Sequence, residues 1–114
     1  MNKTLDFNSI KKPTLTLTMP DEERTVIRVL TPTVELVEKL TANEKDLTET
    51  LKTPDQAGVM AAFELAAEYI SINKDGITVT AEDLRGKYNW GIDELIIFFS
   101  AYKGFVETIE TAKN

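Results

Sequence analysis

The chain lacks cysteine and histidine entirely among its 114 residues. Without cysteine it forms no disulfide, binds no metal through thiolates and has no cysteine nucleophile. Without histidine it lacks the commonest metal ligand and the side chain that most often acts as a general base near neutral pH. A glycine-rich phosphate loop and a Gly-x-Ser-x-Gly motif are also missing. These absences predict a protein that is not an enzyme and that uses no cofactor and no metal.

Basic residues are scarce, with 13 Lys and Arg against 19 Asp and Glu and a net charge of -6. Because nucleic-acid binding depends on clustered Lys and Arg, we expect no nucleic-acid partner. The charge is also uneven: residues 1–30 carry five basic and four acidic groups, and residues 31–114 carry eight and fifteen. The second part is therefore at -7, which favours a basic or mixed-charge partner.

Long apolar runs are absent as well. The first ten residues, MNKTLDFNSI, contain no apolar core of a signal peptide, so we expect a cytoplasmic protein. The most apolar stretch, residues 90–109, is interrupted by Asp93, Glu94 and Lys103. A membrane span needs about 20 mostly apolar residues, so no membrane partner is predicted.

What the chain does contain begins with a strand pattern. Residues 14–19 alternate threonine with leucine or methionine, a period of two that is typical of a half-buried strand. Residues 20–23, Pro-Asp-Glu-Glu, suit a turn, and residues 25–30 have the composition of a second strand. The pattern predicts a β-hairpin over residues 13–31, preceded by an N-terminal arm over residues 1–12.

The rest of the chain, residues 32–110, has the apolar rhythm of amphipathic helices. Signals for four helix starts follow one another, at Thr31-Pro32-Thr33, Thr53-Pro54, Thr80 and Gly91-Ile92. The Thr41-Ala42-Asn43 patch leaves open whether the first of these is one helix or two. The sequence therefore predicts a single α+β domain over residues 1–114, mostly helical, with an N-terminal hairpin followed by about four helices.

The stretch from Trp90 to Ile109, which contains most of the last predicted helix, holds five of the nine aromatic residues. One of its faces, Leu95-Ile96-Phe99-Tyr102-Val106, is broad enough to be the internal seam, and a second flank carries further apolar residues. Two interpretations stay open: the whole segment is core, or part of it is an interaction surface. The residues that we predict to bind a protein partner come from this helix and the Ala-rich helix before it: Phe63, Tyr69, Phe98, Ala101, Tyr102 and Phe105.

Carboxylates occur in adjacent groups, which raises the question of acid–base catalysis or a hard-metal site. The groups are Asp21-Glu22-Glu23, Glu82-Asp83 and Asp93-Glu94. The first belongs to the predicted turn, and the other two lie at helix N-termini, where acidic residues are favoured by the helix dipole. Asn73-Lys74-Asp75-Gly76 lacks the ligand spacing of an EF-hand. We therefore interpret these groups as structural.

Several parts of the sequence together resemble one family. They are the Thr-rich strand Pro13–Leu17, a second strand running into Leu30–Thr33, an Ala-rich middle helix, and the ending Leu95–Val106. The combination is similar to the small tail assembly chaperones of long-tailed phages and prophages of Gram-positive bacteria. The most telling part is Asp83-Leu84 followed by the Phe-x-x-Tyr-x-x-Phe run from Phe99 to Phe105.

The resemblance implies a non-enzymatic role in the host cytoplasm. Such chaperones bind the long, helical, aggregation-prone tape measure protein and help the tail-tube protein to polymerise around it. The alternative is a virion structural component, a head–tail or tail protein that assembles through its hairpin. Since unpaired strand edges are templates for pairing, we also expect a homo-oligomer.

Overall fold

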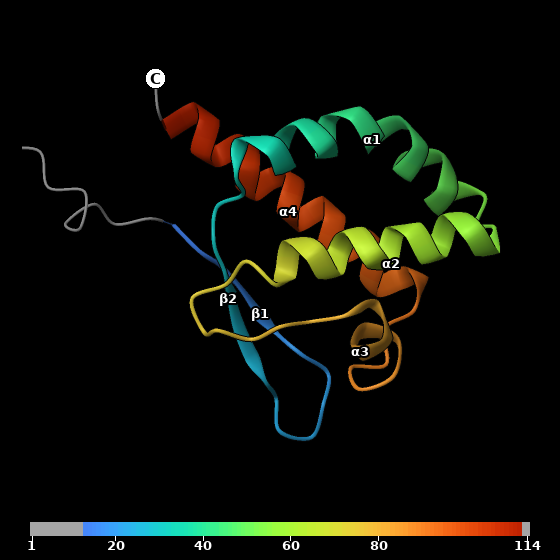
Figure 1. The fold of residues 1–114 in the computed structure, drawn as a ribbon, viewed down its shortest axis with the longest axis horizontal. Helices are drawn as coiled ribbons and strands as arrows, with labels where there is room; N and C mark the ends of the chain where they lie inside the picture. The colour runs from blue at the N-terminus through green and yellow to red at the C-terminus, as the bar shows by residue number, and fades with distance from the viewer. Residues whose placement is uncertain (1–12, 113–114) are drawn as a thin grey trace, which may run out of the picture.

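A computed structural model describes residues 13–112 and contains a two-stranded hairpin followed by four helices (Figure 1). The elements are β1 (Leu15–Thr18), β2 (Val26–Val29), α1 (Val34–Lys52), α2 (Gln56–Ile70), α3 (Ala81–Arg85) and α4 (Ile92–Ala112). The predicted α+β fold, mostly helical with an N-terminal hairpin, is confirmed. The predicted arm over residues 1–12 lies outside the described residues.

The hairpin follows the alternation seen in the sequence. β1 and β2 are antiparallel, with Leu17 opposite Ile27. Ile27 is fully buried and Leu17 is partly buried against the core, while the threonines of β1 are exposed. In the turn, the Thr25 N–H donates to Asp21 Oδ1 at 2.8 Å. The strand period thus places one apolar face on the helices and one polar face outward.

The outer edge of β2 is closed by the turn that follows α2. The Leu30 N–H donates to the Ile72 carbonyl at 2.8 Å, and the Lys74 N–H donates to the Arg28 carbonyl at 2.9 Å. The Arg28 N–H donates to Asp75 Oδ2 at 2.8 Å, and hydrogen bonds from Arg28 lower the pKa of Asp75. In this turn Gly76 has a φ of 68°, the left-handed conformation that favours glycine.

Helix α1 is continuous through residues 41–43, so the possible break there does not occur. The polar side chains of this patch bond to carbonyls one turn back, Thr41 Oγ1 to Val37 O and Asn43 Nδ2 to Lys39 O. The prediction that Thr53 caps the next helix is wrong, because its N–H still donates to Glu49 O in the last turn of α1.

Asp55 caps α2 instead, accepting a hydrogen bond from the Gly58 N–H at 2.6 Å. Helix α2 is the centre of the fold, in contact with α1, α3, α4 and β2. Its small side chains permit this close approach, since Ala62 and Ala66 are fully buried. Figure 1 shows α2 between α1 on one side and the hairpin on the other.

Helix α3 begins as its sequence predicts. The Thr80 hydroxyl accepts from the Asp83 N–H at 3.0 Å, and Asp83 Oδ2 accepts from the Thr80 N–H at 3.1 Å. This reciprocal capping box fixes the start of the helix. The loop after α3 then leads through Trp90 into α4. The ring of Trp90 packs against that of Phe98 in α4, with the two ring centroids 5.8 Å apart.

Candidate protein-binding groove

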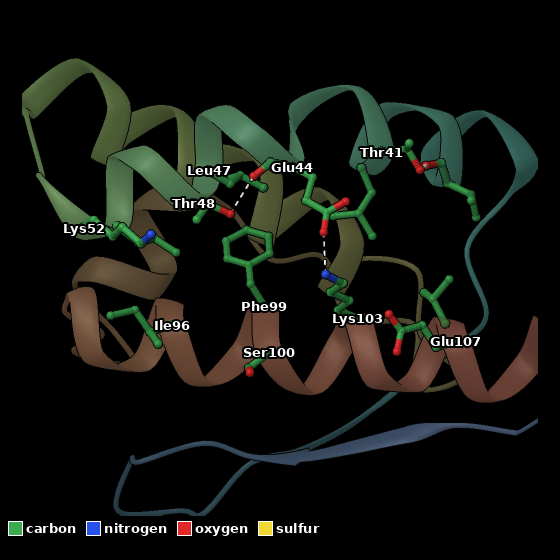
Figure 2. Close-up of a pocket in the computed structure, with 14 residues that line it drawn as sticks. Thr41, Glu44, Leu47, Thr48, Lys52, Ile96, Phe99, Ser100, Lys103 and Glu107 are labelled. Atoms are coloured by element: carbon green, nitrogen blue, oxygen red, sulfur yellow. Dashed lines mark hydrogen bonds and ion pairs between the residues drawn. The ribbon is translucent and has the colours of Figure 1, made fainter.

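Helices α1 and α4 both pack against α2, and an open groove of about 500 Å³ separates them from each other. They run in opposite directions along it, so that Lys52 lies near Ile96 at one end of the groove (Figure 2). Glu107 lines the opposite end. A groove between two helices has the form that receives an extended or helical segment of another protein.

The groove has an apolar floor and a rim that is polar except for Ile96. The floor consists of side chains that are buried or half-buried: Val37, Leu40, Leu47 and Leu51 from α1, and Phe99 and Val106 from α4. The rim consists of exposed side chains: Thr41, Glu44, Thr48 and Lys52 from α1, and Ile96, Ser100, Lys103 and Glu107 from α4. Figure 2 shows the ring of Phe99 projecting from α4 toward α1.

The groove exists because α1 has more apolar surface than α2 covers. Leu36, at 7% exposed, is the one buried residue of α1. The Leu36 carbonyl accepts a hydrogen bond from the Tyr69 hydroxyl at 3.0 Å, and Lys39 Nζ lies 2.8 Å from Glu68 Oε2. These contacts attach one flank of α1 to α2. Its other apolar flank faces the groove.

One ion pair crosses the groove among the described residues, from Lys103 Nζ on α4 to Glu44 Oε1 on α1 (Figure 2). Both side chains are about half exposed. The hydrogen bond from Lys103 to Glu44 and the negative charge of Glu44 raise the pKa of Lys103, and the charge of Glu107 adds to the effect. Solvent screens an exposed pair of this kind, so it contributes little to stability and does not lock the two helices together.

The structure places four of the six predicted binding residues inside the protein. Phe98, Tyr102, Phe63 and Tyr69 are at most 3% exposed. The expectation that Phe98 lies on an exposed flank is therefore wrong, because its ring packs among those of Trp90, Phe99 and Tyr102.

The tyrosine rings of this set belong to one aromatic cluster. Tyr69 and Tyr102 stack with centroids 4.6 Å apart, and Phe98 stacks on Tyr102 at 5.5 Å. Ala101 is exposed and Phe105 is half-buried, so partner contacts at these two positions stay a prediction. In the described part of the chain, none of the six lines the groove.

Sequence reasoning missed the α1 side of the groove and placed Ile96 in the internal seam, whereas it is 43% exposed. The available signal was in α1, where Leu40, Leu47 and Leu51 form an apolar stripe in a helix otherwise rich in charge. A stripe of this kind is also typical of a helix that packs on a core. A helical pattern alone does not say whether a second helix covers it.

No helix between residues 13 and 112 is both long and apolar enough to cross a membrane. Within the same range, no three acidic side chains are grouped so that they could hold a metal ion. Comparison of the chain with models of protein families, with curated proteins and with solved structures found no match.

Proposed function

We propose that this protein is a tail assembly chaperone of a long-tailed phage. It binds apolar helical segments of the tape measure protein in the host cytoplasm and assists assembly of the tail tube around them. In this role it performs no catalysis and needs no cofactor. The proposal joins the family resemblance of the sequence to the groove between α1 and α4.

The observation that carries the proposal is the apolar floor of this groove with its charged rim. A helix with one apolar face buries that face on Leu40, Leu47 and Phe99, while its polar face stays in water. The contact area available to one helix is small, and the wall helix α1 is attached mainly through one flank. Such a site holds an aggregation-prone segment and releases it when the tube subunits arrive.

Two adjacent isoleucines of α4 provide the test. Ile96 lines the groove and is 43% exposed, whereas Ile97 does not line it and is 67% exposed. Replacing Ile96 by Gln removes apolar area that a bound helix covers. It also introduces a side-chain amide that loses its hydrating water when the helix binds. The combined loss is on the order of 1–2 kcal/mol, or about tenfold in affinity.

We expect Ile96→Gln to lose the ability to keep a co-expressed tape measure segment soluble, and Ile97→Gln to retain it. Both changes keep a good helix former at an exposed site, so melting curves of the two variants should agree with the unmodified protein. The proposal is contradicted if Ile97→Gln loses the segment while Ile96→Gln keeps it, or if both keep it.

The second candidate, a virion component that assembles through the hairpin, is favoured by the outer edge of β1. The Met19 N–H donates to the Thr25 carbonyl, so the alternation of an antiparallel ladder directs the backbone groups of Thr16 and Thr18 away from β2. Among the described residues nothing pairs with them. A homo-oligomer formed through this edge is compatible with either role. Purified virions separate the two, because a chaperone is absent from them and a structural component is present.

A further inference from the structure

The ion pair between Glu44 and Lys103 lies where a bound helix must pass. Glu44 belongs to the rim on α1 and Lys103 to the rim on α4, and Figure 2 shows their contact bridging the two helices. A helix that reaches the apolar floor along the length of the groove separates these two side chains. Each then needs a new partner or full contact with water.

We propose that the groove selects a helix with a lysine or arginine beside its apolar face, and that this cation replaces Lys103 at Glu44. The inference rests on the proposed function and specifies the chemistry of the helix that it binds. It predicts an exchange of ion pairs: the entering cation takes the carboxylate of Glu44, and Lys103 remains on the α4 rim beside Glu107.

The charges around Glu44 favour an entering helix that carries a cation over one that carries an anion. Lys103 interacts with the carboxylates of both Glu44 and Glu107, so this part of the groove carries two negative charges and one positive. An entering cation makes the charges equal, whereas an entering anion leaves three negative charges against one positive.

The other cation of the rim, Lys52, is too distant to compensate. It follows Glu44 by eight helical positions, about 12 Å along α1, which exceeds the screening length of about 8 Å at physiological salt. The net charge of the whole chain, -6, also favours a basic partner.

Peptide binding to the full chain tests the exchange. The probe is a fluorescently labelled helical peptide of about 16 residues, the length of the groove wall from Val37 to Lys52, with leucines along one face. Three versions carry Lys, Gln or Glu at one central position beside the leucines. We expect fluorescence anisotropy to give the affinity order Lys, then Gln, then Glu, with about fivefold or more between the first and the last, or about 1 kcal/mol.

The decisive comparison uses the two halves of the ion pair. Glu44→Gln and Lys103→Gln break the same contact, and both side chains are about half exposed, so both variants should fold. We expect Glu44→Gln to weaken binding of the Lys peptide about fivefold and Lys103→Gln to strengthen it. Lys39→Gln is the control, because it breaks the exposed Lys39–Glu68 pair on the other flank of α1 and should leave binding unchanged.

If the ion pair has a different role, the two substitutions change the affinity for the Lys peptide in a different direction. If the pair only closes the groove, both substitutions strengthen binding; if it maintains the shape of the groove, both weaken it; either result overturns the exchange. Equal affinity of the three peptides also overturns it while leaving the proposed function intact. If none of the peptides binds, the groove is not the binding site and both proposals fail.

Discussion

Removing one buried hydroxyl group should stabilise the protein. Tyr102 is 1% exposed, and among the described residues its hydroxyl oxygen has no hydrogen-bond partner. Its ring stacks on Tyr69 and Phe98, contacts that do not involve the hydroxyl. The substitution Tyr102→Phe therefore keeps the aromatic packing and removes a polar group that folding transfers out of water without compensation.

The expected gain follows from two opposing terms. Burying an unpaired hydroxyl costs about 1–3 kcal/mol in mutational data. Deleting one oxygen atom from a packed site leaves a small void, which costs a few tenths of a kcal/mol. We expect Tyr102→Phe to raise the free energy of unfolding by about 1–2 kcal/mol, and the melting temperature by about 4 °C per kcal/mol.

The matched control is the same chemical change at Tyr69. That side chain is fully buried too, but its hydroxyl donates to the Leu36 carbonyl at 3.0 Å and attaches α1 to α2. Tyr69→Phe removes this hydrogen bond, and the protein should lose about 1 kcal/mol.

Urea unfolding followed by circular dichroism measures the free energy of unfolding of both variants. The signal comes from the helices, so it is not lost when a tyrosine is replaced. Opposite signs for the two substitutions support the reasoning. A loss of stability in Tyr102→Phe as large as that in Tyr69→Phe would refute it, because the Tyr102 hydroxyl would then have a stabilising partner.

Two further predictions concern the core. Burial raises the pKa of Tyr69 to about 12 and also raises that of Tyr102, so the folded protein retains protons that the unfolded chain releases near pH 10. These groups should therefore leave the free energy of unfolding unchanged below about pH 10 and lower it above that pH, by up to about 1.4 kcal/mol per pH unit for each tyrosine. Urea unfolding at successive alkaline pH values measures this slope. A free energy of unfolding that stays level up to pH 12 contradicts the pKa shift. Phe98→Ala should destabilise the protein by about 3–5 kcal/mol, as much as Phe99→Ala, because Phe98 is 2% exposed; a melting curve close to that of the unmodified protein would place Phe98 at the surface.

The elements with strong local signals could be predicted from the sequence. Alternating threonine and leucine predict β1, and Thr80 followed by acidic residues predicts the start of α3, because both signals depend on residues close together in the chain. The cap of α2 illustrates the limit. Thr53 and Asp55 are both good caps, and the length of α1 decides between them, since Thr53 is still occupied by α1.

The groove could not be predicted because it depends on how three helices are placed. Periodicity gives α4 two apolar flanks but does not say which of them faces α2. The ring of Trp90, which packs 5.8 Å from that of Phe98, comes from the preceding loop and lies outside the helical pattern. Ile96 is left at the rim because α1 approaches α2 rather than α4, and no local pattern in the sequence encodes that choice.

The most direct test of the central claim is a footprint of a bound tape measure segment on this protein, measured by amide hydrogen exchange with and without the segment. Binding in the groove predicts slower exchange in α1 and α4, over residues 37–52 and 96–107, and unchanged exchange in the hairpin. Slower exchange in β1 with none in α1 or α4 would contradict the claim and favour assembly through the hairpin edge.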